Sequence, residues 1–427
     1  MNYEETIAFL YTQLPMYSRI GKAAYKSDLI NTQKLCALLD HPENGFRSIH
    51  IAGTNGKGST SHMLAAMLQS NGYKTGLYTS PHLKDFRERI RINGVMIPEK
   101  EVVDFVNAYQ EKVIEIGCSF FEWTVGLAFD YFRKEEVDIA VIETGLGGRL
   151  DSTNVITPLL SVITNVSYDH MDLLGETLQK IAVEKAGIIK HNIPVVIGEH
   201  SMETDAVFIK TAAEKSAPLS FAGDHWKVTG SKYNAQSLLM NIEGNHQQQW
   251  QIELDLMGAY QEKNILTVLE AQRLLIEQGF ILEMQKCVAA LGMVKQLTGL
   301  SGRWEILSTA PLIIADVAHN EAGINHSIQQ LKNYSFKNLH IVIGFVREKD
   351  IRKILSLFPD KAIYYFCKPD IPRGLETEAL QAAGIESGLN GISYASVAAA
   401  FEAAKKNASV EDIIYVGGST FVVAEVI

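Results

Sequence analysis

A short glycine-rich stretch, residues 49–60, combines the residue types that a phosphate-binding turn requires. Its three glycines allow backbone conformations closed to other residues, so successive N–H groups can converge on phosphate oxygens at the start of the following helix (Gly53, Gly56 and Gly58). Lys57 adds a positive charge. The hydroxyls of Ser59 and Thr60 are oxygen ligands of the kind that a phosphate-bound Mg²⁺ needs. The stretch therefore predicts a phosphate-binding loop.

An alternative is an ordinary glycine-rich turn between a strand and a helix. The stretch departs from the pattern G-x-x-x-x-G-K-[ST], because Ile51 replaces the first glycine and Gly58 separates Lys57 from Ser59. Its context favours phosphate binding, since an apolar strand at Ser48–Ala52 precedes it and a buried helical pattern follows it.

Two more predicted strands end in groups that could do chemistry. Val137–Ile142 leads into Glu143 and a run of glycines, and Leu159–Val166 leads towards Asp169 and His170. Ligand chemistry in open α/β sheets lies at the carboxyl ends of strands, so we expect these groups to converge on the glycine-rich stretch. A single histidine is more often structural than a ligand, and this convergence raises the odds of a functional role for His170 to roughly even.

The elements that position these groups alternate between strands and helices, which predicts an α/β fold with two domains. The first is a large doubly wound domain over residues 1–297, with antiparallel strands at Ser237–Ile242 and Gln249–Leu254 on the margin of its sheet. A glycine-punctuated linker, Leu297–Gly302, leads into a smaller Rossmann-like α/β domain over residues 298–427. Three polar groups lie near the start of that domain, namely Arg303, Asp316 and His319.

Several side chains have a functional and a structural interpretation. The charged segment Ser80–Arg91 is interpreted residue by residue as a solvated loop. Its Arg89 and Arg91, with Arg149, could meet substrate carboxylates, although a surface role has at least equal weight for each. Three aromatic residues could line a slot for a flat ring, although we expect at least two of them to be core residues: Phe120, Phe121 and Trp123.

The bulk composition excludes some classes of protein. A chain of 427 residues with 47% hydrophobic residues can bury a sizeable core, and its net charge of −10 argues against a general binder of nucleic acid or anionic membranes. There is no signal peptide at the N-terminus and no run of 18 apolar residues, so we expect a cytoplasmic protein. The cysteines have no metal-site spacing and are expected to be buried free thiols (Cys36, Cys118, Cys287 and Cys367).

Together these motifs closely resemble the folylpolyglutamate synthase family, including its bifunctional dihydrofolate synthase type, within the Mur ligase superfamily. The resemblance covers almost the whole chain. The segments that carry it are Ala24–Leu29, His50–Ser59, Thr79–Leu83, Glu88–Ile90 with Asn93 and Gly94, Glu143–Arg149, Asp169–His170, Glu184–Ile188, Gln261 with Asn264, and Gly302–Arg303.

The resemblance implies roles for individual residues. The implied nucleotide-binding residues are Gly53, Thr54, Asn55, Gly56, Lys57, Gly58, Ser59, Thr60, Asn264, Arg303 and Asp316. The implied Mg²⁺ ligands are Ser59, Ser80, Glu143, His170 and Lys185, with Lys185 as a carbamate. The implied catalytic residues are Lys57, Glu143, His170, Lys185 and His319, and the substrate-binding residues are Arg89, Phe121, Arg149 and Asp151.

The implied activity is an ATP- and Mg²⁺-dependent ligation of L-glutamate to folates, and also to dihydropteroate, through an acyl phosphate. The partners are then these small molecules, with no nucleic acid or membrane, and the enzyme is a monomer. One alternative is a P-loop regulatory NTPase, but a guanine signature Asn-Lys-x-Asp is missing. Another is a Mur-type cell-wall ligase, but only 52 residues precede Gly53, fewer than a separate substrate domain needs.

Overall fold

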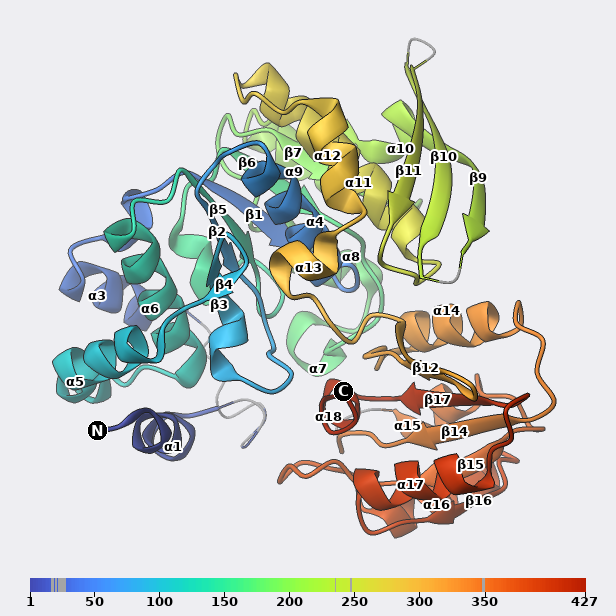
Figure 1. Cartoon of the computed structure of the whole chain (residues 1–427). Coiled ribbons are helices and arrows are strands. Elements are labelled where there is room, and N and C mark those ends of the chain that lie inside the picture. The colour runs from blue at the N-terminus through green and yellow to red at the C-terminus, as the bar shows by residue number, and fades with distance from the viewer. Residues whose placement is uncertain (17–18, 20, 22–27, 235, 246–247, 348–349) are drawn as a thin grey trace. The chain divides into compact units, whose positions relative to one another are not determined.

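The computed structural model describes residues 1–16, 19, 21, 28–234, 236–245, 248–347 and 350–427. Residues 24–27 of the motif at Ala24–Leu29 lie outside the described residues. The chain divides into two compact units (Figure 1). The larger contains Met1–Asp255 and Gln261–Leu300, and the smaller contains Leu256–Tyr260 and Ser301–Ile427.

The larger unit is built on an eight-stranded sheet in the order β4-β3-β2-β5-β1-β6-β7-β8. Six neighbouring strands of this sheet, β2, β5, β1, β6, β7 and β8, run parallel to one another. β3 and β4 extend the sheet beyond β2 as antiparallel strands. Their bounds are β1 (Ser48–Ala52), β2 (Thr75–Tyr78), β3 (Ile90–Ile92), β4 (Val95–Met96), β5 (Ile139–Glu143), β6 (Leu160–Ile163), β7 (Val195–Ile197) and β8 (Leu219–Phe221). The central strands are buried along their whole length, as expected for parallel strands covered on both faces.

Helices cover both faces of this sheet. On one face, α6, α8 and α9 pack against residues such as Ala52, Ala140 and Ile163, and α4 and α11 pack together on the other. The bounds are α1 (Tyr3–Gln13), α3 (Ile30–Leu38), α4 (Lys57–Ser70), α5 (Glu99–Ile116), α6 (Phe120–Lys134), α7 (Met171–Leu174), α8 (Leu178–Ala186), α9 (Asp205–Glu214), α10 (Ala222–His225), α11 (Gln261–Glu277), α12 (Met284–Leu291) and α13 (Val294–Thr298). Short 3₁₀ helices are η2 (Pro42–Asn44), η3 (Phe86–Arg89) and η4 (Ser152–Val155).

The predicted position of the antiparallel strands was wrong. They do not extend the margin of the main sheet but form a separate three-stranded sheet in the order β11-β10-β9, with bounds β9 (Trp226–Tyr233), β10 (Leu238–Gly244) and β11 (Gln248–Leu254). The side chains of β10 alternate between buried and exposed, so this sheet buries only one face. Such a strand needs no layer of structure on its exposed face. A strand that continued the main parallel sheet would have to be covered on both faces.

The prediction of a solvated loop at Ser80–Arg91 was also wrong for two of its arginines. The Glu88 carboxylate accepts hydrogen bonds from three successive backbone N–H groups, those of residues 83–85, at 2.7, 2.9 and 2.8 Å. This folds the segment tightly into η3 and β3, and Arg89 and Arg91 become buried. Arg87 is partly buried and forms an ion pair with Asp85.

The smaller unit contains a six-stranded sheet in the order β12-β13-β17-β14-β15-β16, of which only β12 is antiparallel. The strands are β12 (Glu305–Thr309), β13 (Leu312–Ala315), β14 (Leu339–Ile343), β15 (Ile363–Phe366), β16 (Gly391–Ser393) and β17 (Ile413–Gly417). The helices are α14 (Glu321–Leu331), α15 (Ile351–Leu355), α16 (Thr377–Glu386), α17 (Val397–Asn407) and α18 (Thr420–Ala424). The sheet and its helices give the expected Rossmann-like α/β architecture.

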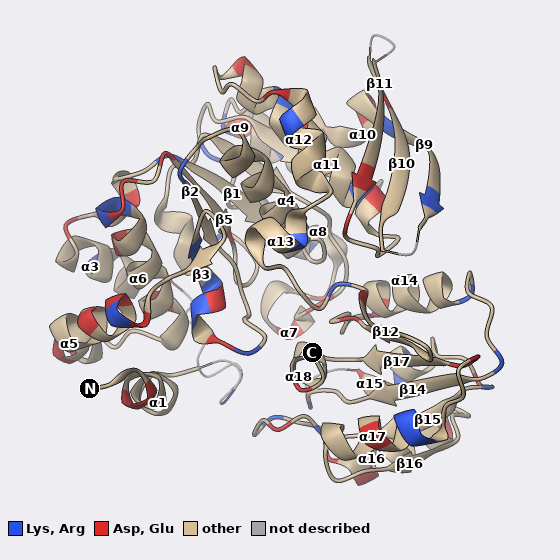
Figure 2. Cartoon of the chain, viewed as in Figure 1, with Lys and Arg blue, Asp and Glu red and all other residues tan. Residues whose placement is uncertain are grey.

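Other predictions from composition can be compared with the structure. All four cysteines are buried free thiols, as predicted. Lysine and arginine are interspersed with aspartate and glutamate along the described elements of each unit (Figure 2). Among the described helices, none has the length and the apolar character needed to cross a bilayer.

Candidate active site

Three neighbouring strands bring the predicted polar groups to one edge of the larger sheet. β1 lies between β5 and β6, and all three run parallel, so their carboxyl ends meet at the same edge. Gly53 follows β1, Glu143 ends β5, and the segment after β6 leads to Asp169. The adjacency predicted for these strands is confirmed. The chain order of the strands also reverses around β1, which is where such sheets bind ligands.

The glycine-rich stretch forms a turn in which two glycines cannot be replaced without a clash. Gly53 has a φ of 155°, and a Cβ there would stand 1.9 Å from Thr164 Oγ1. Gly56 has a φ of 84°, and a Cβ there would stand 2.3 Å from Asn264 Oδ1. Lys57 begins α4 and donates hydrogen bonds to the carbonyls of Gly53 and Thr54 at 3.0 and 3.2 Å. The ammonium is therefore held over the turn at the N-terminus of a helix, which is a favourable place for an anion.

A chain of amides holds the hydroxyl of Ser59 in place behind this turn. Asn264 Nδ2 donates to Gln261 Oε1 at 2.8 Å, and Gln261 Nε2 donates to Ser59 Oγ at 3.1 Å. All three side chains are buried. Ser59 thus accepts from Gln261 and keeps an oxygen lone pair for a cation. Sequence reasoning gave Gln261 no role, although its spacing of three residues from Asn264 on one helical face was a usable signal.

Glu143 and Ser80, which the family resemblance implies as ligands of one metal ion, lie within hydrogen-bond distance of each other. The Ser80 N–H donates to Glu143 Oε2 at 3.2 Å, and the glutamate is buried at the end of β5. A carboxylate and hydroxyl oxygens make the hard-oxygen donor set that Mg²⁺ prefers, so these residues fit the metal. Within the described ranges, no group of three or more histidine, cysteine or acidic side chains could hold a metal ion. A bound Mg²⁺ would therefore depend on hydroxyl and phosphate oxygens as well.

Lys185 occupies an environment that a surface lysine would not have. It lies on α8 with 2% of its surface exposed. Burial, followed by the positive charge of Lys57, lowers the pKa of its ammonium to about 7, although Asp169 and Asp151 oppose the change. The lowered pKa predicted for this lysine is present. Its amine is therefore substantially neutral near pH 7, which is the nucleophilic form.

His170 stands at a sharp turn after β6. It has a φ of 47°, in the left-handed region, and its backbone N–H donates to Asp169 Oδ1 at 2.9 Å. Its Nε2 is 3.9 Å from Asp169 Oδ2, and its side chain is only partly buried. The turn leaves the ring at the surface of the sheet edge, beside an acidic partner.

The residues predicted to bind substrate are a buried aspartate, a partly buried phenylalanine and two arginines. Asp151 is buried and accepts hydrogen bonds from the N–H of Leu146 at 2.8 Å and from Thr153 Oγ1 at 2.5 Å. Burial raises the pKa of this carboxyl. Phe121 lies against Gly145, where a Cβ would stand 2.4 Å from its ring. Phe120 and Trp123 are core residues, as predicted for two of the three aromatics.

Arg89 and Arg149 have different surroundings. Arg89 is buried, lies over the Phe120 ring at 5.3 Å, and donates from Nε to His82 Nδ1 at 2.8 Å. Arg149 is half exposed and forms an ion pair with Glu184 at 2.8 Å. Arg149 is therefore an exposed cation with a carboxylate partner in the chain, whereas Arg89 is a buried cation of the kind that recognises carboxylates.

In the smaller unit, Asp316 is already surrounded by donors. It accepts from the Tyr260 hydroxyl and the Trp304 N–H at Oδ2, both at 2.8 Å, and from the Ala318 N–H at Oδ1, at 2.9 Å. His319 donates from Nδ1 to the Val317 carbonyl at 3.0 Å, and Arg303 donates to the Ser301 carbonyl at 3.3 Å. Asp316 therefore orders the segment that carries Arg303 and His319 within this unit.

The fold and the phosphate-binding loop define a P-loop α/β enzyme. The Mur ligase middle domain matches residues 51–271, and the Mur ligase, glutamate ligase domain matches residues 302–420. The chain belongs to the Mur ligase family, and within it to the folylpolyglutamate synthases and dihydrofolate synthases. Its members are ATP-dependent ligases, and this chain is an ATP-dependent ligase of that class.

Similar proteins support this assignment. The chain is 34% identical to folylpolyglutamate synthase from Lacticaseibacillus casei over 395 residues, which is 90% of this chain and 89% of that one. Its structure is similar to that of E. coli FolC in complex with DHPP and ADP, with a TM-score of 0.86 at 28% identity, covering 100% of this chain and 97% of the other. It is also 31% identical, over its full length, to a probable bifunctional folylpolyglutamate synthase/dihydropteroate synthase from Haloferax volcanii, and it spans 50% of that protein's length.

The cofactors follow from the structural relatives. The Yersinia pestis folylpolyglutamate synthase/dihydrofolate synthase, complexed with AMPPNP and Mn ion, matches with a TM-score of 0.85 at 26% identity, covering 100% of this chain and 97% of that one. ATP and a divalent metal ion are the cofactors of this class of enzyme.

Proposed function

We propose that this protein adds L-glutamate to the carboxylate of folates, and also to dihydropteroate, through an acyl phosphate. The observation that carries the proposal is the convergence at one sheet edge of the phosphate-binding loop, the Ser80 and Glu143 oxygens and the buried Lys185. These groups serve a phosphoryl transfer, and the neighbouring Asp151 and Phe121 offer a polar and an aromatic contact to the acceptor.

A carboxylate is a poor electrophile with no adequate leaving group, so it must be activated before an amine can attack it. In the proposed reaction the substrate carboxylate attacks the γ-phosphate and ADP leaves. The amine of glutamate then attacks the acyl phosphate, loses its proton and expels phosphate, leaving the amide. Such transfers depend mainly on positioning and on neutralisation of charge, and Lys57 supplies one fixed cation.

Two Mg²⁺ ions are proposed for this step. One would be held by Ser80, Glu143 and His170, and the other would lie near Ser59 and Glu143, with Lys185 as a carbamate close to both. When bound, Mg²⁺ would neutralise charge on the phosphate oxygens. The chain's own contribution is to hold the oxygens in place, through the bond from Gln261 to Ser59 and the bond from Ser80 to Glu143.

Lys185 is proposed to act as a carbamate. Its neutral amine would attack CO₂, form an N–C bond and release a proton, which exchanges a cation for an anion near the metal ligands. The burial of Lys185 and the nearby charge of Lys57 support this step because they favour the neutral amine.

The remaining roles are assigned in the same proposal. Asn264 positions the phosphate-binding loop, Arg303, Asp316 and His319 serve the nucleotide, and Arg89 and Arg149 serve the substrate carboxylates. The ATP- and folate-binding functions are placed in residues 1–297 and the ligase function of the Rossmann-like domain in residues 298–427. We further propose a cytoplasmic monomer without a nucleic-acid or membrane partner. The net charge of −10 supports the absence of a nucleic-acid or anionic-membrane partner.

The test is the dependence of ADP release on each substrate. Purified protein with ATP and Mg²⁺ should release ADP only when a pteroyl carboxylate and L-glutamate are both present, and dihydropteroate should replace tetrahydrofolate. Turnover with ATP alone, unaffected by either substrate, would overturn the ligase proposal and favour a regulatory NTPase. Turnover with tetrahydrofolate but not dihydropteroate would remove the second activity only.

A further inference from the structure

A short segment, Leu256–Tyr260, belongs to the smaller unit, although the chain on both sides of it belongs to the larger unit. The chain returns to the larger unit at Gln261, which is the first residue of α11. Tyr260 and Gln261 are therefore joined by a single peptide bond, yet the hydrogen bonds of their side chains lie in different units. Whatever fixes Tyr260 also fixes the point at which the backbone of Gln261 begins.

The segment is fixed within the smaller unit through its backbone and through its last side chain. The buried Gln330 of α14 accepts from the Ala259 N–H at Oε1 and donates from Nε2 to the Met257 carbonyl, both at 2.7 Å. The Tyr260 hydroxyl donates to Asp316 Oδ2 at 2.8 Å. A hydrogen bond to a carboxylate is stronger than one between neutral groups, so Asp316 is the firmest support of the last residue of the segment.

The ring of Tyr260 lies over Gly258 of the same segment. A Cβ at Gly258 would stand 2.4, 2.6 and 2.8 Å from the Cζ, Cε1 and Cε2 atoms of this ring. A side chain at residue 258 would therefore displace the ring, and with it the hydroxyl that reaches Asp316. The φ of Gly258 is not positive, so an alanine there would act through the ring and not through backbone strain.

On the other side of the peptide bond, Gln261 supports the phosphate-binding loop. Its Nε2 donates to Ser59 Oγ at 3.1 Å, and its Oε1 accepts from Asn264 Nδ2 at 2.8 Å. The side chain of Gln261 is 0% exposed, so it has little room to follow a shift of its own backbone. Hydrogen bonds of this kind extend to about 3.2 Å, so a backbone shift of about 0.5 Å would weaken the bond to Ser59.

We propose that Tyr260 is a positioning residue for the metal ion that is bound with the nucleotide. Its hydrogen bond to Asp316 fixes the start of α11, and Gln261 in turn holds the Ser59 hydroxyl in the orientation that Mg²⁺ requires. This inference rests on the proposed role of Ser59 as a Mg²⁺ ligand. Tyr260 itself touches neither the nucleotide nor the metal ion. Asp316 thereby gains a second task, because a carboxylate of the smaller unit supports a metal ligand of the larger one through the chain.

The experiment compares the full-length wild type with Tyr260→Phe, which removes only the hydroxyl. Tyr334→Phe is the matched control, because the Tyr334 hydroxyl also has a hydrogen bond in the smaller unit, from Trp304 Nε1 at 3.2 Å, but Tyr334 does not adjoin α11. The dissociation constant of the ATP analogue AMPPNP is measured by calorimetry with Mg²⁺ and again with a chelator. A melting curve of each ligand-free protein shows that it is folded.

Tyr260→Phe should bind AMPPNP about three- to tenfold more weakly than the wild type with Mg²⁺, as expected when one hydrogen bond is lost, and equally well without Mg²⁺. Gly258→Ala should show the same difference between the two conditions, since it displaces the same ring. Tyr334→Phe should match the wild type in both. In a Gln261→Ala background the link to Ser59 is already broken, so Tyr260→Phe should cause no further loss.

An affinity of Tyr260→Phe equal to that of the wild type with Mg²⁺ would overturn this inference alone. An equal loss with and without Mg²⁺ would also overturn it, because Asp316 would then act on the nucleotide directly. An additive loss in the Gln261→Ala background would overturn it as well. Ser59→Ala tests the proposal on which the inference rests. If Ser59→Ala binds AMPPNP with Mg²⁺ as tightly as the wild type, Ser59 is not a metal ligand, and both the proposed metal site at Ser59 and this inference are overturned.

Discussion

Asn264 stands directly behind Gly56, so that a Cβ at Gly56 would lie 2.3 Å from Asn264 Oδ1. The two residues are far apart in the sequence, yet the amide on α11 supports the turn that begins α4. Any side chain at residue 56 must displace Asn264, and with it the hydrogen bond that holds Gln261 against Ser59.

Gly56→Ala should therefore weaken ATP binding by about tenfold or more. This loss adds to the cost of placing alanine in the left-handed backbone conformation of residue 56, which is about 1 kcal/mol. Gly72→Ala is the matched control, because Gly72 has a similar φ of 92° but a Cβ there would have no atom within 4 Å. Nucleotide affinity and melting temperature are measured for both. Equal losses of nucleotide affinity in the two variants would show that backbone strain alone acts and that Asn264 has no role.

Lys57→Ala should reduce kcat by about 10²-fold or more, because it removes a preorganised cation that faces developing negative charge. Its two hydrogen bonds are to carbonyls of its own turn, so the fold should survive. Lys112→Ala, at an exposed position on α5, provides the control for loss of one positive charge. A folded Lys57→Ala protein with near-native turnover would mean that the phosphates bind elsewhere.

Lys185→Ala should abolish most activity, and a small carboxylic acid in excess should restore part of it by replacing the missing carbamate oxygens. Lys185→Arg should fail, because arginine keeps its positive charge and cannot react with CO₂. A density map of the protein with ATP and Mg²⁺ would show the adduct directly. An unmodified ammonium in that map, together with an active Lys185→Arg protein, would exclude the carbamate.

The sequence was sufficient to predict which strand ends form the candidate site, because buried parallel strands and the residues that follow them are local features. It could not predict contacts between distant segments. The support of Gly56 by Asn264, the separate sheet formed by β9–β11 and the burial of Arg89 all depend on tertiary packing.

Two histidines, the buried His50 and the partly buried His82, should make the protein less stable in acid. Burial lowers the pKa of His50 to about 3 and the pKa of His82 to about 3. Between this value and the pKa of about 6.5 in the unfolded chain, the unfolded state binds more protons, so the free energy of unfolding falls as the pH falls. The buried His50 should cost up to about 2 kcal/mol between pH 6.5 and 5, and the partly buried His82 should cost less.

Urea unfolding at pH 7 and pH 5 measures this loss. His50 donates from Nε2 to Thr153 Oγ1 at 2.8 Å, because Thr153 itself donates to Asp151. His50→Gln keeps a donor there but cannot titrate, so its stability should change less with pH than that of the wild type. An identical loss in wild type and variant would show that other groups cause the acid sensitivity.

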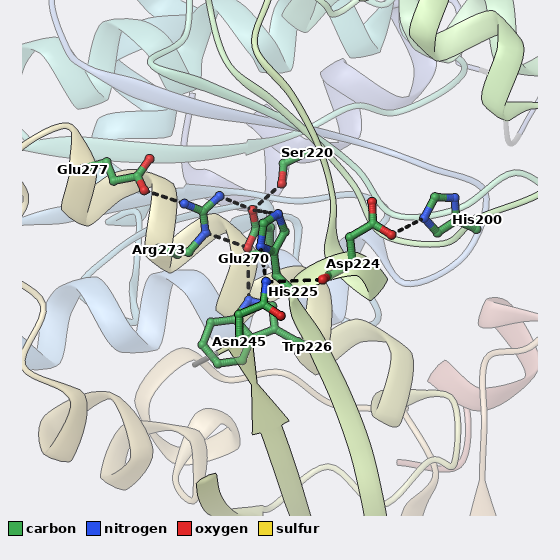
Figure 3. Close-up of polar contacts among 9 residues, drawn as sticks. All are labelled: His200, Ser220, Asp224, His225, Trp226, Asn245, Glu270, Arg273 and Glu277. Atoms are coloured by element: carbon green, nitrogen blue, oxygen red, sulfur yellow. Dashed lines mark hydrogen bonds and ion pairs between the residues drawn. The ribbon is translucent and has the colours of Figure 1, made fainter. Parts of the chain in front are cut away.

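The last prediction concerns Glu270, whose buried carboxylate joins the three-stranded sheet to the body of the larger unit (Figure 3). It accepts hydrogen bonds from the Trp226 indole at 3.0 Å and from the Ser220 hydroxyl, and it forms an ion pair with Arg273 on its own helix. Removal of this acceptor leaves buried donors without a partner. Glu270→Ala should therefore lower the free energy of unfolding by about 1–3 kcal/mol.

Glu277→Ala provides the matched control, because Glu277 pairs with the same Arg273 (Figure 3) but its side chain is 58% exposed. An exposed ion pair is worth at most about 1 kcal/mol, so this variant should be close to wild type. Hydrogen exchange should locate the effect of Glu270→Ala in β9, where Trp226 begins the strand, while the amides of β1 and β5 keep their protection. Equal destabilisation by the two substitutions would show that the ion pair with Arg273, rather than the bonds to Trp226 and Ser220, holds the sheet in place.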